Sequence, residues 1–262
     1  MQTIVTTWLH SIGTYAVTLC AAIGSFMLFF HRAFKTAYNG APSLHKILVQ
    51  MERIGLESFN IIFLTGTFAG MVFALQTYIG FQRVGGEQFI GSVIALGMIR
   101  ELGPVLTGLM VTGRAGSAIA AEIGTMKISE QIDALSTLGI DPYRYLIVPR
   151  IIAGTIVMPF LTLFAMACGI VGGYIVCVYV LMLSPHDYVT TIAMHVELTD
   201  IIGGIIKAAV FGLILSWVGA FKGYQTHGGA KGVGLATTQA VVTASIMILM
   251  SNYFLTKLLE RL

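Results

Sequence analysis

The sequence predicts an all-α polytopic membrane protein. Of its 262 residues, 56% are hydrophobic and 10% are charged, and the mean hydropathy is +0.85. Soluble domains usually carry about a quarter charged residues, so this chain has too few charges to cover a globular surface. Its length also leaves no room for a soluble catalytic domain beside several membrane spans. We therefore expect residues 1–262 to form a single membrane-embedded domain.

An N-terminal segment, residues 1–57, is expected to precede the spans. Its apolar stretch from Gly13 to Phe30 is short for a span, and the sequence leaves open whether this stretch lies along the membrane or dips into it. A second helix is expected to begin at Pro42 and Ser43. It has an amphipathic pattern, which predicts a helix lying in the membrane interface; an ordinary surface helix is the alternative. Its apolar face consists of Leu44, Ile47, Leu48, Met51 and Ile54.

A five-span core is predicted over residues 58–257. A helix needs roughly 20 mostly apolar residues to cross a bilayer, and five segments meet this requirement. The predicted spans are residues 58–81, 91–121, 151–183, 201–221 and 233–257.

The distribution of Lys and Arg predicts the orientation of these spans. One set of connecting segments carries nine Lys and Arg residues, and the alternate set with the C-terminal tail carries three. Because basic residues accumulate on the cytoplasmic side, segments 31–57, 122–150 and 222–232 are expected to face the cytoplasm. The acidic segment 184–200 is expected to be an external, solvated loop.

The cytoplasmic segment 122–142 has the pattern of a short amphipathic helix. Thr125 is a candidate N-cap, and Gly139 and Pro142 are expected to end the helix. Its apolar stripe must pack against the spans or against a partner protein. The polar residues of the segment are Glu122, Lys127, Glu130, Gln131 and Asp133.

Enzyme and cofactor motifs are missing from the sequence. It contains no P-loop, no zinc-protease motif and no nucleophile elbow, so we expect neither catalysis nor a nucleotide or other cofactor bound by this chain. His186 and His195 share a segment with three carboxylates, but their spacing is unspecific and predicts no metal site. No basic run supports binding of nucleic acid. A transporter built on this chain would therefore need a partner ATPase, and segment 122–142 is where it would dock.

Charged residues inside the predicted spans are the most informative feature. Arg100 and Glu101 lie in an apolar segment just before Gly103 and Pro104, and Lys207 lies in the fourth predicted span. Charges in the hydrocarbon core are costly unless they are paired or hydrated. Two interpretations stay open, a structural pair such as Glu101 with Lys207 and the lining of a polar pocket. Pro104 is expected to kink the helix because it removes a backbone hydrogen bond.

The sequence resembles the MlaE-type permeases of lipid-transporting ABC systems over about residues 45–257. Several motifs occur in the order found in that family, which makes the resemblance specific. They are Gly66–Gln76, Arg100–Pro104, Gly113–Ala118, Ala121–Gly124, Glu130-Gln131, Asp141-Pro142, Pro149-Arg150 and Gly232–Thr238.

This resemblance implies a permease that works as a homodimer in the bacterial inner membrane, with the plastid inner envelope as the alternative. It implies that ATP is bound by a separate MlaF-type ATPase, docked on the coupling helix at about 122–142. An MlaD-type protein with an MCE domain and a small MlaB-type STAS protein are the further implied partners. The implied cargo is phospholipid, moved between the inner membrane and the outer envelope, with a role in outer-membrane lipid asymmetry. Some relatives carry other lipids, such as sterols.

A lipid path is consistent with the residues themselves. A lipid needs apolar walls and a few cations near its headgroup, and Arg100 and Lys207 are candidates for these cations, with Glu101 holding one of them in place. Gln76 and Tyr78, near the outer end of the first span, are candidates for additional hydrogen bonds. An ion or small-solute channel is the alternative class, but it would need repeated polar faces along several spans. An intramembrane enzyme would need a nucleophile and a base, and the sequence offers no such pair.

Overall fold

The computed structural model describes residues 2–39, 43–83 and 85–259, and these ranges consist of helices joined by short turns, with no β-strand. Within them, five helices are long and apolar enough to cross a membrane, as predicted. Their bounds are Leu44–Phe81, Glu87–Ile128, Tyr143–Val180, Leu198–Tyr224 and Gly229–Leu259. The first, fourth and fifth are the single helices α2, α9 and α10.

The second and third spans are composite. The second contains a short 3-10 turn η1 (Glu87–Phe89), then α3 (Ile90–Gly97), α4 (Gly103–Val111) and α5 (Ser117–Ile128). Two π-helical segments, η2 (Met98–Leu102) and η3 (Thr112–Gly116), join these three helices. The third span is α7 (Val148–Ile175) between the π-helical segments η4 (Tyr143–Ile147) and η5 (Val176–Val180). Single π turns inside α-helices are common at functional sites.

The prediction of a separate interfacial helix before the first span is wrong. Helix α2 runs without a break from Leu44 to Phe81 and buries Ile47 and Ile54 in the main core. Nothing between the two predicted segments stops a helix, because the lone Gly55 is tolerated and the charges at Arg53 and Glu57 pair with a neighbouring helix. The expected start at Pro42 lies outside the described residues.

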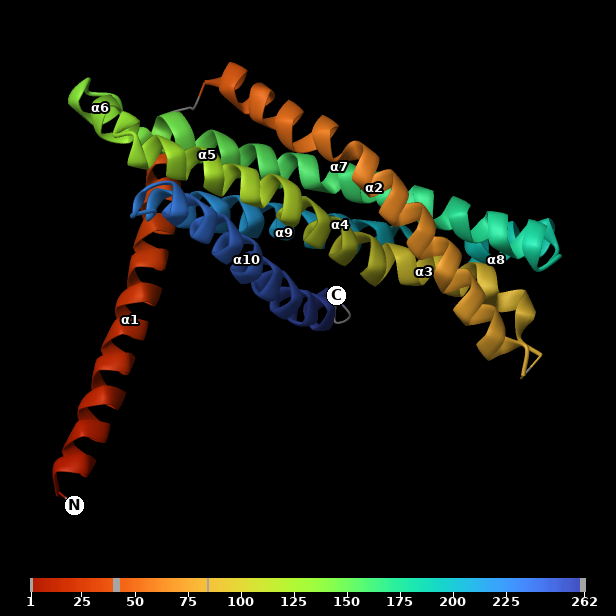
Figure 1. Ribbon diagram of the computed structural model, residues 1–262. Helices are drawn as coiled ribbons and strands as arrows, with labels where there is room; N and C mark the ends of the chain where they lie inside the picture. The colour runs from red at the N-terminus through yellow and green to blue at the C-terminus, as the bar shows by residue number, and fades with distance from the viewer. Residues whose placement is uncertain (1, 40–42, 84, 260–262) are drawn as a thin grey trace.

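Helix α1 (Gln2–Asn39) is longer than the apolar stretch predicted there. Its C-terminal half packs on α9, where the Phe26 and Trp217 rings stack with their centroids 4.1 Å apart and Phe29 is buried. Its N-terminal end lies away from the other helices (Figure 1). This helix therefore crosses the bundle near one end and does not run alongside the spans.

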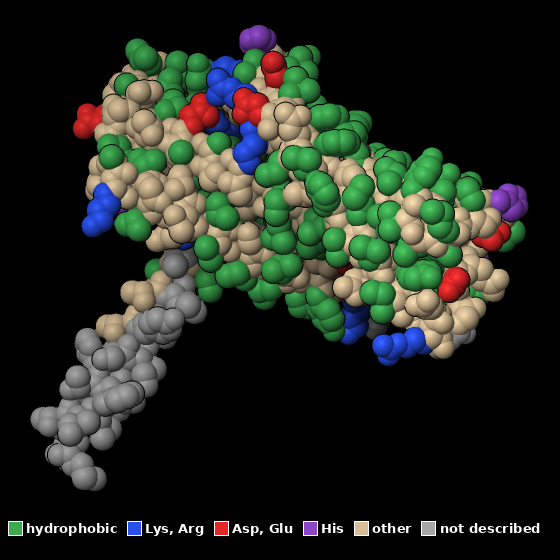
Figure 2. All heavy atoms as spheres, turned by 45° about the vertical axis from the view of Figure 1, so that its right-hand side comes forward, with side chains coloured by type: hydrophobic (Ala, Val, Ile, Leu, Met, Phe, Trp, Pro, Cys, Tyr) green, Lys and Arg blue, Asp and Glu red, His purple; other side chains and the backbone are tan. Residues whose placement is uncertain are grey.

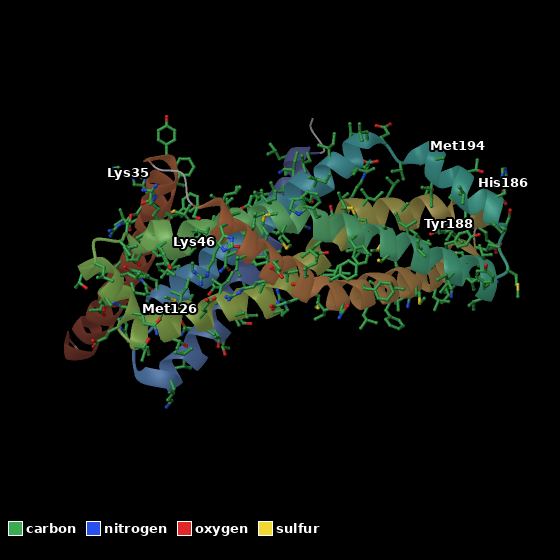
Figure 3. All side chains as sticks on the ribbon, turned by 90° about the horizontal axis from the view of Figure 1, so that it is seen from above. Lys35, Lys46, Met126, His186, Tyr188 and Met194 are labelled. Atoms are coloured by element: carbon green, nitrogen blue, oxygen red, sulfur yellow. The ribbon has the colours of Figure 1, made fainter. Side chains whose placement is uncertain are left out.

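The two ends of the bundle agree with the predicted alternation of loops. The short helix α6 (Gln131–Thr137), the start of α2 and the α9–α10 turn lie at one end, and α8 (Pro185–His195) lies at the other (Figure 1). From above, the labelled Lys46 and Met126 are at the α6 end, whereas His186 and Met194 are at the α8 end (Figure 3).

Two local expectations are corrected. Thr125 lies inside α5 and does not cap a helix; the chain breaks at Glu130, whose φ of 59° is left-handed, before α6 begins. Segment 184–200 is mostly the helix α8, capped by the Ser184 side chain, and is not an irregular loop. Its Tyr188 is buried and donates to the Ile170 carbonyl at 2.9 Å, and burial raises the pKa of that hydroxyl. No group of metal ligands occurs in the described part of the chain.

Small residues bring α2 and α7 into direct backbone contact. A β-carbon at Gly70 would overlap the Gly169 backbone, and one at Gly66 would touch the Ala165 carbonyl oxygen. Such close approach is how helices associate in lipid, where apolar surface alone gives little driving force. Elsewhere hydrophobic side chains spread over much of the visible surface (Figure 2), as expected for contact with lipid tails.

Candidate functional site

The ammonium group of Lys207 is the centre of a polar network inside the bundle. Its side chain is 4% exposed, although it carries a charge. Its Nζ donates to the Glu101 carboxylate at 2.8 Å, to the Arg100 carbonyl at 2.7 Å and to the Thr256 hydroxyl at 2.7 Å. An ammonium group has three N–H donors, so every donor of Lys207 has a partner. The pair of Glu101 with Lys207, one of the two interpretations of the sequence, is present.

Gly103 and Pro104 explain why the Arg100 carbonyl can accept this bond. Proline has no N–H, so Pro104 cannot make the α-helical bond to the carbonyl four residues earlier. The Gly103 N–H bonds instead to Met98, which closes the π-helical segment η2. The sequence placed a kink at Gly103 and Pro104, and the structure shows a change of helix type directly before them. The Arg100 carbonyl, which has no α-helical partner, therefore accepts a hydrogen bond from Lys207.

Helix α10, the fifth span, completes the network begun by the second and fourth spans. The Asn252 amide donates to Glu101 at 2.8 Å, and the Thr256 hydroxyl donates to the same carboxylate at 2.9 Å. Asn252 and Thr256 are four residues apart and share one face of α10. Sequence reasoning missed both, although two polar residues at this spacing in an apolar helix are a detectable pattern.

Arg100 itself pairs with Asp200, which the sequence analysis also missed. The guanidinium Nη2 lies 2.6 Å and Nε 2.7 Å from the Asp200 carboxylate. Asp200 belongs to the capping box of α9 with Glu197, a pattern readable from the sequence. The Asp200 side chain is 6% exposed, whereas that of Arg100 is 55% exposed. Arg100 therefore presents a positive charge at the surface, beside an internal network in which every Lys207 donor is used.

Gln76 and Tyr78 do not join this network. Gln76 is exposed on α2, and Tyr78 is half-buried against the smaller apolar cluster near α8. Among the described residues, no hydrogen bond links either side chain to Arg100, Glu101 or Lys207. Their place in a lipid path stays a prediction.

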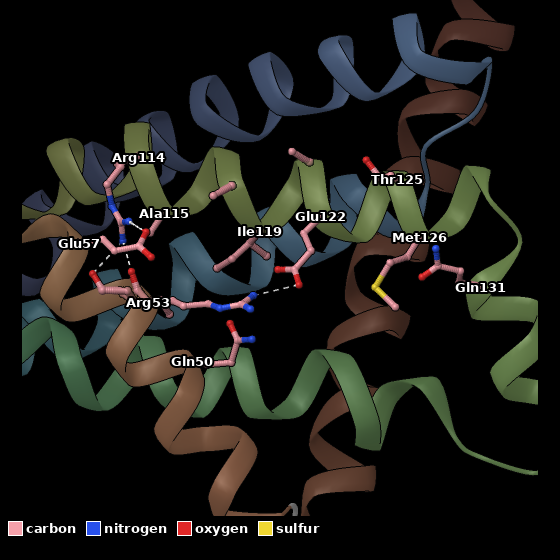
Figure 4. Close-up of a pocket in the computed structure, with 13 residues that line it drawn as sticks. Gln50, Arg53, Glu57, Arg114, Ala115, Ile119, Glu122, Thr125, Met126 and Gln131 are labelled. Atoms are coloured by element: carbon pink, nitrogen blue, oxygen red, sulfur yellow. Dashed lines mark hydrogen bonds and ion pairs between the residues drawn. The ribbon is translucent and has the colours of Figure 1, made fainter.

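The predicted coupling residues fall into two groups. Lys127 and Asp133 form an ion pair at 3.0 Å across the turn between α5 and α6, and Glu130 and Gln131 are exposed beside it. Glu122 lies in a cleft of about 970 Å³ between α2 and α5, which Gln131 also lines (Figure 4). Its carboxylate bonds to other spans of the same chain, which the sequence pattern did not indicate.

Comparison with known proteins assigns the chain to a family. The family model for permease MlaE matches residues 47–258, which include every residue of the Lys207 network and of the α5–α6 turn. The chain belongs to the MlaE permease family. It is therefore an α-helical, multi-pass inner-membrane permease of the ABC class.

Curated relatives of this family match most of the chain. A probable ABC transporter permease of Rickettsia conorii is 47% identical over 95% of this chain and 96% of its own length. The intermembrane phospholipid transport system permease protein MlaE of Haemophilus influenzae is 37% identical over 96% of this chain and 97% of its own length. The chloroplastic protein trigalactosyldiacylglycerol 1 of Arabidopsis thaliana is 43% identical over 79% of this chain and 59% of its own length.

Proposed function

We propose that this chain is the membrane subunit of an ABC-type phospholipid transporter that moves lipid between the inner membrane and the outer envelope. The observation that carries this proposal is the network around Lys207, with the half-exposed Arg100 at its edge. A phospholipid needs an apolar path with a cation for its phosphate, and guanidinium groups bind phosphate through paired hydrogen bonds. The name of the Haemophilus relative supports the choice of phospholipid over other lipids.

Within this proposal the two cations, Arg100 on η2 and Lys207 on α9, have different roles. Arg100 contacts the lipid phosphate, because its guanidinium is exposed and can exchange Asp200 for another anion. Lys207 has no free donor and is nearly inaccessible, so it holds the three spans together with Glu101. This division revises the sequence prediction, in which either cation was a candidate for the phosphate.

The energy for transport comes, in this proposal, from a separate MlaF-type ATPase that binds ATP and docks at the α5–α6 turn. The exposed Glu130, Gln131 and Asp133 beside Lys127 offer a charged surface for it. We further propose a homodimer, with an MlaD-type MCE-domain protein on the opposite side of the membrane and an MlaB-type STAS protein with the ATPase. The ABC class supports the ATPase, and the MlaE family supports the choice of Mla-type partners.

Reconstitution tests the proposal. The complex purified through this chain should contain an ATPase, and its ATP hydrolysis should rise in phospholipid vesicles together with transfer of labelled phospholipid. Hydrolysis that responds to sterol and not to phospholipid would identify another lipid as cargo. Ion flux without any bound ATPase would favour a channel and refute the proposal.

A charge reversal tests the docking site separately. Changing Glu130 and Asp133 together to Lys should detach the ATPase while the membrane protein stays folded, because both side chains are exposed and the one ion pair that is lost, between Asp133 and Lys127, lies at the surface. Unchanged copurification of the ATPase and unchanged lipid-dependent turnover would show that the docking site lies elsewhere.

A further inference from the structure

Glu122 connects three separate helices of the chain. It lies on α5, and one carboxylate oxygen is 3.2 Å from Arg53 of α2, while the other is 2.9 Å from Arg150 at the start of α7. The Arg150 side chain is 3% exposed, so Glu122 supplies the counter-charge for a buried cation. Both oxygens are therefore paired with cations of the chain's own helices.

A second polar link crosses the same cleft. Arg114 of η3 forms an ion pair with Glu57 of α2 and also donates to the backbone carbonyls of Arg53 and Ile54 (Figure 4). The cleft of about 970 Å³ separates the first part of α2 from α5, and these ion pairs bridge it. The later part of α2 is held differently, by direct backbone contact of Gly66 and Gly70 with α7.

Glu122 is also close to the proposed docking site along the chain. Helix α5 ends at Ile128, less than two turns beyond Glu122, and the Lys127–Asp133 ion pair fastens its last turn to α6. A force on α6 therefore acts on α5 next to Glu122. From there it reaches α2 through Arg53 and α7 through Arg150.

We propose that Glu122 is a positioning residue that transmits movement of α6 to α2 and α7 during transport. This inference rests on the proposed function, because it assumes that an ATPase moves α6. In this role Glu122 does not contact the ATPase, which differs from its sequence-based assignment to the docking surface. Without its negative charge, α2 loses its ion pair with α5 and keeps only the link from Arg114 of η3, and the ATPase cycle then no longer changes the width of the cleft.

Thiol crosslinking across the cleft tests this role in the complete complex. Gln50 of α2 and Thr125 of α5 both line the cleft and would be changed to Cys in a chain lacking Cys20, Cys168 and Cys177. The yield of crosslink with a short bifunctional thiol reagent would be compared without nucleotide and with ATP trapped by vanadate. We expect the yield to change with nucleotide in this parent, and not in the same chain carrying Glu122→Gln.

Matched variants separate transmission from folding. Glu52→Gln removes the same charge from an exposed position of α2 and should respond to nucleotide as the parent does. Arg53→Gln breaks the bond to α2 but leaves the Arg150–Glu122 pair, so it should lose the response even if Glu122→Gln fails to fold. In both Glu122→Gln and Arg53→Gln, lipid transfer per ATP hydrolysed should fall by about five-fold or more, the lower end of typical coupling between sites.

The outcomes are distinct. If the crosslink yield of the parent is the same with and without nucleotide, while the ATPase is bound and active, the inference is overturned and the proposed function stays intact. A normal response in Arg53→Gln would also overturn the inference. A parent complex without any ATPase would refute the proposed function, and this inference with it.

Discussion

Two ion networks hold this bundle together, and they are built differently. The Lys207 network comprises Arg100, Glu101, Asp200, Lys207, Asn252 and Thr256, and the Glu122 network comprises Arg53, Glu57, Arg114, Glu122 and Arg150. Each contains a cation whose side chain is 3–4% exposed. In the first, every Lys207 donor is used and the Asn252 Oδ1 acceptor has no partner, whereas in the second the Nε donors of both Arg114 and Arg150 have no partner within the described structure.

This difference indicates where the permease is rigid and where it can move. The Lys207 network joins the second, fourth and fifth spans through neutral and charged partners at short range. Its Lys207 and Glu101 side chains are 4% and 40% exposed. The two ion pairs by which the Glu122 network crosses the cleft are more open, with 54% and 41% for Arg53 and Glu122 and 25% and 65% for Arg114 and Glu57. Exposed ion pairs contribute little to stability, so these contacts can be exchanged at low cost. The first network fixes the spans, and the second links moving parts.

The largest expected effect tests the rigid network. Changing Glu101 to Ala leaves the Lys207 ammonium buried without its counter-charge, and removing one partner of a buried pair costs about 3–5 kcal/mol. We expect the variant to lose thermal stability and assembly with its partners. Thermal unfolding in detergent and size-exclusion chromatography measure this. Stability equal to the unmodified chain would mean that Glu101 is not a structural partner of Lys207.

The next effect concerns the later part of α2, which is held by direct backbone contact with α7 and not by ion pairs. Changing Gly70 to Val forces α2 away from Gly169, and overpacking of this kind costs about 1–3 kcal/mol. Gly80→Val on the same helix is the control, since a β-carbon there meets no atom within 4 Å. Thermal unfolding should separate the two variants. Equal melting temperatures would contradict the close helix contact.

The smallest expected effect is in the Glu122 network. Changing Glu57 to Gln removes an exposed acid from its pair with Arg114, which keeps its bonds to two α2 carbonyls. The expected loss of stability is about 0.2–1 kcal/mol and should shrink at high salt. Thermal unfolding at two salt concentrations measures it. A loss as large as that of Glu101→Ala would mean that the two networks do not differ in kind.

Much of the fold was predictable because spans depend on local composition. Five apolar windows gave the five spans, and the isolated charges at Arg100, Glu101 and Lys207 marked the polar network. The continuity of α2 was missed because an amphipathic segment and an apolar segment can form one helix. This happens when the charged residues of the amphipathic segment pair with residues of a neighbouring helix. Those partners are set by tertiary packing, which no local pattern contains.

The site was predictable in part for the same reason. Pairing between Glu101 and Lys207 was one of two open interpretations, whereas Asp200, Asn252 and Thr256 were not considered. The capping box of Asp200 and the spacing of Asn252 and Thr256 are visible in the sequence, but their pairing with Arg100 and Glu101 is set by tertiary packing. The inward direction of Glu122 depends on Arg53 and Arg150, which lie 69 and 28 positions away in the sequence.

Lipid crosslinking from position 100 tests the central claim most directly. A photoreactive amino acid would replace Arg100 in the complete complex in phospholipid vesicles, and assembly of Arg100→Ala would be measured beside it. The account predicts a phospholipid adduct at position 100, and an Arg100→Ala complex that assembles but binds and transfers less lipid. An absent adduct, together with failed assembly of Arg100→Ala, would make Arg100 a purely structural partner of Asp200 and contradict the lipid path.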